Sequence, residues 1–314
     1  MTRPALLLKA GPAALDHIRA NGLDAASIRT FAGASGGAKW LVLYGLDCAI
    51  AESLLPRLTA PVNLVGSSIG TWRYACYAQN DPVAALKRFR DAYVEQRYSE
   101  RPDRDEITRV SRDLLAQVLG ANGAGEIVAH PLFRSHVIAV RCRGLTASES
   151  RLALGSGLAL AAAANLASRR TLGWQFQRVL FHDRRSEASL LQPHGFPLLR
   201  VELTHANVAD AIVASSSIPL VLDGVAAIDG APPGVYRDGG LIDYHLDLPL
   251  SADGGITVYP HFYERLIPGW FDKRLTWRRP APEHLSRVLL LAPSPEFVAG
   301  LPGGKIPDRT DFYT

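Results

Sequence analysis

A Gly-Ser-Ser-Ile-Gly stretch at residues 66–70 constrains the fold of this chain more than any other feature. It follows an apolar run at residues 62–65, typical of a strand, and precedes residues 71–79, which have helical character. A serine on a sharp strand-to-helix turn has a strained backbone that only small neighbours tolerate. We therefore expect Ser68 to project its hydroxyl free of a sheet, as a nucleophile does, rather than to lie in an ordinary glycine-rich turn.

A second strand–loop–helix unit precedes this one in the chain. Residues 28–31 are typical of a short strand, residues 33–37 form a Gly-Ala-Ser-Gly-Gly loop, and residues 39–55 have apolar side chains at helical spacing. The two units are about 30 residues apart, the length of one βαβ step, so their strands should be parallel neighbours. Parallel strands bind ligands at their carboxyl ends, and we expect both loops to border one crevice.

The remaining pattern alternates helices and strands. We expect a first strand at residues 5–8, helical structure over residues 81–119 and 208–217, a turn at 238–240 after a strand at 234–237, and strands at 137–140, 198–203, 257–259 and 288–291. Residues 143–196 have no clear assignment. Their uncharged part, residues 152–167, is shorter than the ~20 residues that span a bilayer. It predicts a helix in the core or at an interface, with the core favoured.

Composition bounds the class of protein. With 314 residues, 47% of them hydrophobic, and no linker, the chain predicts one α/β domain over residues 1–314, with its motifs in residues 28–250 and later strands and loops in residues 251–314. The 34 basic and 30 acidic residues are scattered, which does not favour a nucleic-acid partner. The three cysteines lack metal-ligand or disulfide spacing, which predicts free thiols in a cytoplasmic protein without metal or cofactor.

A nucleophilic serine needs donors for the oxyanion that forms on its substrate. The backbone around Gly36 and Gly37 has no side chains to block its N–H groups, and the helix that follows adds its dipole. The loop lacks the spacing of nucleotide-binding motifs, so we favour an oxyanion hole over a phosphate-binding loop. Lys39 either orients the loop or contacts a lipid phosphate, or it is a solvated residue at a helix start.

The serine also needs a base. A conventional hydrolase would use a late histidine, and His245, His261 and His284 are available, although none lies in a persuasive sequence context. Asp238 lies between a strand and two glycines, where its backbone is constrained and its carboxylate faces a crevice. A carboxylate can accept the serine proton directly if its pKa is tuned.

Four motifs in order resemble those of the patatin-like phospholipases. They are the Ser-Gly-Gly-Ala-Lys loop at residues 35–39, the stretch at 66–70, Ala-Ser-Ser-Ser-Ile-Pro at 214–219, and Asp-Gly-Gly at 238–240. The resemblance covers roughly residues 30–249. It implies a three-layer α/β/α fold with a mostly parallel central sheet, and calcium-independent hydrolysis of glycerolipid acyl esters by a Ser-Asp dyad.

The resemblance also implies a role for each matching residue. Ser68 would be the nucleophile, Asp238 the base, and the N–H groups of Gly36 and Gly37 the oxyanion hole, whereas the segment at 214–219 receives no catalytic role. The chain departs from the family in having Ser35, Lys39 and Trp40 where the loop usually has glycine, arginine and glycine. Likewise, it has Asp247 where the family often has asparagine.

Residues 259–279 interleave aromatic and basic side chains, a mixture suited to a membrane–water boundary or to a partly buried loop with solvated cations. The sequence thus predicts a serine lipid acyl hydrolase acting on a phospholipid or lysolipid, with peripheral membrane contact left open. Two alternatives remain: an α/β-hydrolase with a Ser-His-Asp triad, and a lipid-binding protein without catalysis.

Overall fold

The computed structural model of the chain describes residues 4–186, 195–251 and 254–312. Part of the segment that the sequence left unassigned, residues 187–194, lies outside the described residues, as do the first three residues. The strands of the described ranges are β1 (Leu6–Ala10), β2 (Ile28–Gly33), β3 (Val62–Ser67), β4 (Phe133–Cys142), β5 (Phe176–His182), β6 (Leu198–Glu202), β7 (Tyr236–Asp238), β8 (Ile256–Pro260) and β9 (Val288–Pro293). All strands predicted from the sequence are confirmed, with ends shifted by a few residues.

These strands form one sheet in the order β1-β9-β8-β2-β3-β4-β5-β6, with β7 paired to β4. The central neighbours β9, β8, β2, β3 and β4 are all parallel, whereas β1, β5 and β7 join antiparallel partners. The register places Gly33 opposite Gly66, so the first two strand–loop units are parallel neighbours, as predicted. Their loops therefore leave the same edge of the sheet.

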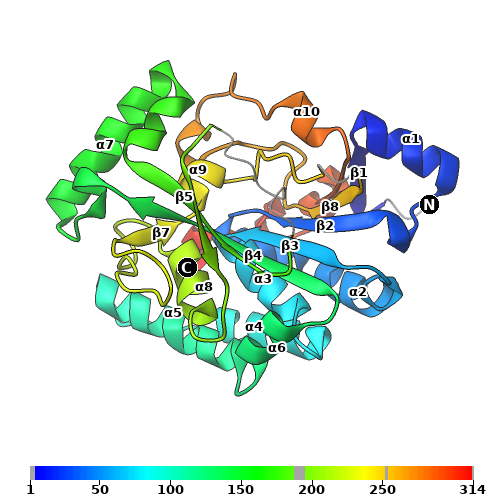
Figure 1. The fold of residues 1–314 in the computed structure, drawn as a ribbon, viewed down its shortest axis with the longest axis horizontal. Helices are drawn as coiled ribbons and strands as arrows, with labels where there is room; N and C mark the ends of the chain where they lie inside the picture. The colour runs from blue at the N-terminus through cyan, green and yellow to red at the C-terminus, as the bar shows by residue number, and fades with distance from the viewer. Residues whose placement is uncertain (1–3, 187–194, 252–253, 313–314) are drawn as a thin grey trace.

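Helices cover both faces of the sheet (Figure 1). The α-helices are α1 (Pro12–Asn21), α2 (Tyr44–Ser53), α3 (Ile69–Tyr77), α4 (Pro82–Val94), α5 (Arg104–Leu119), α6 (Gly123–Ala129), α7 (Arg151–Ala167), α8 (Val208–Ser216), α9 (Gly240–Asp243), α10 (Pro282–Leu285) and α11 (Pro295–Ala299). In Figure 1, α2 to α6 and α8 lie below the sheet, and α7, α9 and α10 lie above it. The arrangement is a three-layer α/β/α fold, as expected.

The core consists of two apolar layers, one on each face of the sheet. Successive side chains of a strand point to opposite faces. Phe31 and Leu64 accordingly belong to the layer between the sheet and helices α2 to α5 and α8, whereas Ala32 and Val65 belong to the layer on the other face. Strands buried on both faces are rich in apolar residues, which accounts for Val62, Leu64 and Val65, whereas Asn63 in the same strand is only partly buried.

Two helix predictions need correction. The helix expected over residues 39–55 begins as a 3₁₀ helix, η2 (Gly37–Leu43), before α2. The helical stretch expected over residues 81–119 is two helices, because non-helical residues 95–103 separate α4 from α5. Sequence periodicity continues through such a break, whereas the tight start at Gly37 requires its positive φ of 56°.

The location in the core that was favoured for residues 152–167 is correct for only one side of the segment. This segment forms α7, but just one side of the helix, with Leu154, Gly157, Ala161 and Asn165, is buried. Among the described residues, no helix is long and apolar enough to cross a membrane.

Candidate active site

Ser68 lies on a strained turn between β3 and α3. Its φ of 53° and ψ of −128° place it outside the regions that side-chain-bearing residues normally adopt. Gly66 and Gly70 make the turn possible, because a Cβ on Gly66 would lie 2.7 Å from Thr71 and one on Gly70 would lie 2.1 Å from the Gly33 carbonyl oxygen. The turn therefore packs directly against the end of β2.

Asp238 lies beside Ser68 at the end of β7. The Ser68 hydroxyl donates to Asp238 Oδ2 at 2.7 Å, and the backbone N–H of Gly240 donates to Asp238 Oδ1, also at 2.7 Å. Both side chains are buried, with 4% and 7% of their surface exposed. The two residues predicted as nucleophile and base are thus in direct contact, 170 positions apart in the chain.

The environment of Asp238 suits proton transfer. Burial raises the pKa of this carboxyl to about 6, while the hydrogen bonds from Ser68 and Gly240 and the charge of Lys273 act in the opposite direction. At neutral pH the group is mostly ionised, yet it holds a proton more tightly than an exposed aspartate. A pKa near the working pH is the property that a general base requires.

Ser215, near the end of α8, connects the elements that form the turn. Its hydroxyl oxygen accepts a hydrogen bond from the backbone N–H of Ser68 at 2.9 Å and lies 3.1 Å from Thr71 Oγ1. The same hydroxyl donates to the Ile138 carbonyl oxygen at 2.6 Å. The same helix end also binds β7, because the Asp238 N–H donates to the Ser217 carbonyl. No role for Ser215 was predicted from the sequence, although three consecutive serines, residues 215–217, end an apolar helix.

The glycine loop borders the serine, as predicted for an oxyanion hole. Gly36, Gly37, Ser68 and Asp238 all line one cavity. Gly37 begins η2, and the first N–H groups of a helix have no partner within it. Gly36 packs so closely on the Phe262 ring that a Cβ there would lie 2.3 Å from it. The backbone around Gly37 is thus available to an oxyanion.

Two lysines border the same cavity. Burial lowers the pKa of Lys39, and burial together with the charge of Lys39 lowers that of Lys273 to about 8. Lys273 Nζ lies 4.3 Å from the centre of the Tyr244 ring. Lys273 is exposed as a whole, but its ammonium end lies against this ring, where burial and the Lys39 charge lower its pKa while the Asp238 carboxylate acts in the opposite direction.

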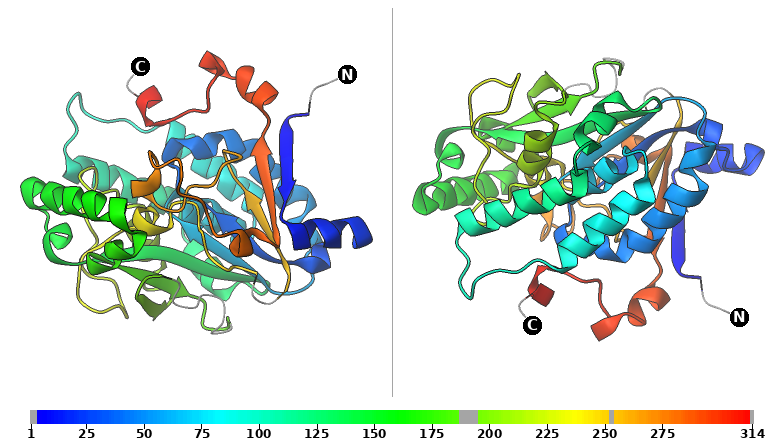
Figure 2. Two further views of the ribbon diagram at one scale, coloured as in Figure 1. Left: turned by 90° about the horizontal axis from the view of Figure 1, so that it is seen from above. Right: turned by 90° about the horizontal axis from the view of Figure 1, so that it is seen from below.

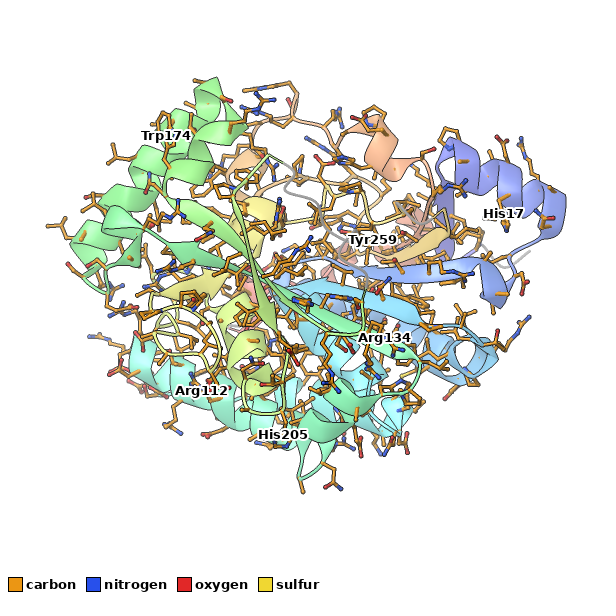
Figure 3. The ribbon with its side chains drawn as sticks, viewed as in Figure 1. His17, Arg112, Arg134, Trp174, His205 and Tyr259 are labelled. Atoms are coloured by element: carbon orange, nitrogen blue, oxygen red, sulfur yellow. The ribbon has the colours of Figure 1, made fainter. Side chains whose placement is uncertain are left out.

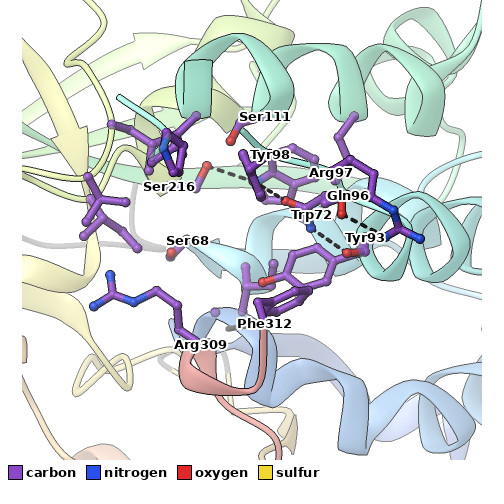
Figure 4. Close-up of a pocket in the computed structure, with 18 of the residues that line it drawn as sticks. Ser68, Trp72, Tyr93, Gln96, Arg97, Tyr98, Ser111, Ser216, Arg309 and Phe312 are labelled. Carbon is purple, nitrogen blue, oxygen red and sulfur yellow. Dashed lines mark hydrogen bonds between the residues drawn. The ribbon is translucent and has the colours of Figure 1, made fainter. Parts of the chain in front are cut away.

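Ser68 stands between two cavities. One, of about 530 Å³, contains Asp238, the glycine loop and the two lysines. The other, of about 450 Å³, has mainly apolar and aromatic walls that include Trp72, Tyr93 and Phe312 (Figure 4). Phe312 stacks edge-on against Tyr93, and Arg309 borders both cavities. Nothing in the sequence indicated that residues 309–312 lie at the site.

The three candidate histidines are hydrogen-bonded to groups other than Ser68 and Asp238. His245 and His261 are fully buried, their Nδ1 atoms accept the N–H groups of Ile267 and Tyr263, and burial lowers the pKa of both side chains. His284 Nδ1 is 2.7 Å from Asp247. Within the described part of the chain, none of the three is hydrogen-bonded to Ser68 or Asp238. The geometry therefore gives no support to a triad.

Over the described ranges, no group of three or more histidine, cysteine, aspartate or glutamate side chains is arranged to hold a metal ion. A scan of the chain against models of protein families found no match, and a search of curated proteins found no similar sequence.

Proposed function

We propose that the protein is a serine acyl hydrolase that cleaves lipid esters with a Ser68–Asp238 dyad, in the manner of the patatin-like phospholipases. The observation that carries the proposal is the 2.7 Å hydrogen bond from the strained Ser68 to Asp238, a buried carboxylate whose pKa is raised to about 6. A serine activated by one adjacent base is the minimal arrangement for nucleophilic acyl transfer.

The reaction would proceed through an acyl-enzyme. Ser68 Oγ attacks the ester carbonyl carbon while Asp238 Oδ2 takes the hydroxyl proton, and the N–H groups around Gly36 and Gly37 stabilise the oxyanion. The intermediate then collapses: the bond to the leaving alcohol breaks, and Asp238 returns its proton to the alcohol oxygen. Asp238 next takes a proton from water as the water oxygen attacks the acyl carbonyl. In the second collapse the bond to Ser68 Oγ breaks, Asp238 returns its proton to that oxygen, and the fatty acid is released.

The two cavities support a lipid ester as substrate. The apolar cavity beside Trp72 and Tyr93 suits an acyl chain, and the cavity with Lys39 and Lys273 suits an anionic headgroup. A phospholipid or lysophospholipid with its ester carbonyl at Ser68 would place these two parts on opposite sides of the serine. Phosphate contact is thus the role we propose for Lys39.

Cys48, Cys76 and Cys142 are all free, and the last two are buried. Burial raises the pKa of both buried thiols, so they are poor candidates for reactive groups. Free thiols are typical of a reducing compartment. We therefore propose a cytoplasmic enzyme that reaches its lipid at a membrane surface.

The test is hydrolysis of a micellar lysophospholipid by the wild type and the Ser68→Ala variant, with the released fatty acid quantified by mass spectrometry. We expect turnover by the wild type and none above background by the variant, with circular dichroism and thermal unfolding showing equal folding. Tight lipid binding without turnover by a folded wild type would instead support the lipid-binding alternative. Equal turnover by both proteins would exclude Ser68 as the nucleophile.

A further inference from the structure

One side of α7 is exposed and uncharged. The helix packs on residues 144–147 and 169–174, whereas Leu152, Leu160 and Leu166 are exposed, Leu160 by 58%, and Ser156, Ala159, Ala162 and Ala163 between them are exposed as well. No charged residue occurs between Arg151 and Arg169. An amphipathic helix normally turns polar residues to solvent, so an apolar outer side indicates a partner surface. We use the name α7 face for this side of α7 together with Trp174, Trp270 and Trp277.

Three exposed tryptophans lie in segments that follow α7 in the chain or contact it. Trp174 follows α7 in the chain and is 74% exposed, while Trp270 and Trp277 come from a loop about 100 residues later. That loop is joined to α7 because Asn165 Nδ2 donates to Asp272 at 2.8 Å and Arg278 donates to the Asn165 carbonyl at 2.6 Å. Figure 2 shows α7 at one edge of the molecule, and Figure 3 shows Trp174 beside it.

The exposed charged residues of the two segments that form the α7 face are basic. No acidic residue occurs between Glu149 and Asp183, and between Glu264 and Glu283 the one acid is Asp272. Asp272 is buried and bound to Asn165 and Arg169, so it adds no exposed negative charge. The exposed cations of the two segments are Arg151, Arg170, Lys273, Arg274 and Arg279.

We propose that the α7 face binds an anionic lipid bilayer, with leucines and tryptophans in the headgroup–acyl boundary and the cations on lipid phosphates. Exposed tryptophans together with arginine and lysine around an apolar helix are the composition of an interfacial segment. A second copy of the chain is a poorer occupant, because two basic rims would repel each other across a twofold axis.

The α7 face also borders the entrance to the site. Leu158 of α7, Trp270 and Lys273 all line the cavity that contains Ser68 and Asp238. A protein bound through this face would place that cavity at the bilayer surface, where a lipid ester could enter it. The orientation of the site rests on the proposed function, whereas the binding itself does not.

Flotation with vesicles tests the binding independently of catalysis. Vesicles of phosphatidylcholine alone are compared with vesicles that also contain phosphatidylglycerol, using the wild type, Leu160→Glu, Arg274→Glu and Leu8→Glu. Leu8 is a matched control, because it is 62% exposed but lies on β1, at the other end of the molecule from α7 in Figure 1. All four proteins are also assayed on a soluble short-chain ester and examined by sedimentation.

We expect the wild type to float with the anionic vesicles, more weakly as salt increases, and Leu160→Glu and Arg274→Glu to lose about tenfold and about fivefold in partition, respectively. Leu8→Glu should float like the wild type, and soluble-ester turnover should be equal in all four. Absence of wild-type binding to either vesicle, or equal loss in Leu160→Glu and Leu8→Glu, would overturn the proposal. The proposal would also be overturned if the wild type were a dimer, and if Leu160→Glu dissociated that dimer but bound vesicles as well as the wild type does.

Discussion

Ser215 accepts the backbone N–H of Ser68 at 2.9 Å, although 147 positions separate the two residues. The serine at the turn is thus fixed from outside its own strand and helix, by the end of α8. The same helix end accepts the N–H of Asp238, so α8 sets the position of both members of the dyad. This arrangement explains how a backbone with an unfavourable φ is retained at Ser68.

Ser215→Ala should impair catalysis more than its effect on folding would suggest. Loss of the acceptor leaves the Ser68 N–H buried without its partner, which costs about 1–3 kcal/mol of stability, and frees the turn to move. We expect kcat on a soluble ester to fall by about tenfold or more, with KM little changed. Ser217→Ala is the matched control, because Ser217 is equally buried at the same helix end but its hydroxyl donates to Val213. Equal kcat in the two variants would contradict the positioning role.

The pH dependence of kcat/KM should follow the ionisation of Asp238. Because the pKa of this carboxyl is raised to about 6, the active ionised form is lost as the pH falls through that value. On a neutral soluble ester, kcat/KM should be constant at alkaline pH, reach half its maximum near pH 6, and fall about tenfold per pH unit below. Lys273→Met should move the midpoint upward, since the charge of Lys273 lowers this pKa. A midpoint near pH 4 would show that burial does not shift Asp238.

Asp238→Asn should change stability in a pH-dependent way. A carboxyl whose pKa is higher in the folded state stabilises the fold below its unfolded value of 3.8, and this contribution is lost as the pH rises through about 6. Relative to Asp238→Asn, the wild type should therefore lose about 3 kcal/mol of unfolding free energy between pH 3.5 and pH 8. Urea unfolding of both proteins at the two pH values measures this difference, in which other titrating groups cancel. A difference that does not change with pH would contradict the raised pKa.

The turn after Asp238 depends on a buried ion pair. Asp243, at the end of α9, accepts two hydrogen bonds from Arg178 of β5, at 2.6 and 2.7 Å, and both side chains are excluded from solvent. Asp243→Ala removes the carboxylate that binds this buried guanidinium and should lower the free energy of unfolding by about 3–5 kcal/mol. Asp113→Ala, which removes the exposed pair with Arg109, should cost less than about 0.5 kcal/mol. Thermal or urea unfolding that gave similar losses for both variants would contradict this assignment.

Local sequence signals predicted the parts of the site that depend on local geometry. The glycines around Ser68 and after Asp238 are required by close backbone approach, and glycine spacing is visible in a single sequence. The layered fold was predictable for a similar reason, because apolar strand runs alternate with amphipathic helices. These features depend on contacts between neighbours in the chain or on its periodicity.

The pairing of Ser68 with Asp238 followed from the resemblance of the motifs, but the other features that depend on long-range contacts were not predictable. Lys273 lies near Asp238 because its loop is bound to α7 through Asp272, and Arg309 and Phe312 reach the cavities from the end of the chain. Neither segment has a sequence signal that places it beside Ser68. The exposure of one side of α7 was likewise hidden, because a uniformly apolar segment gives no periodic signal to separate a buried side from an exposed one.

Labelling with a fluorophosphonate probe, which reacts with activated serines, tests the dyad most directly. Wild type, Ser68→Ala, Asp238→Asn, His245→Gln, His261→Gln and His284→Gln are compared, each with its thermal unfolding recorded to establish that it is folded. The Ser68–Asp238 dyad predicts labelling that disappears in Ser68→Ala, falls sharply in Asp238→Asn and persists in every folded histidine variant. Loss of labelling in a folded histidine variant, or full labelling of Asp238→Asn, would contradict it.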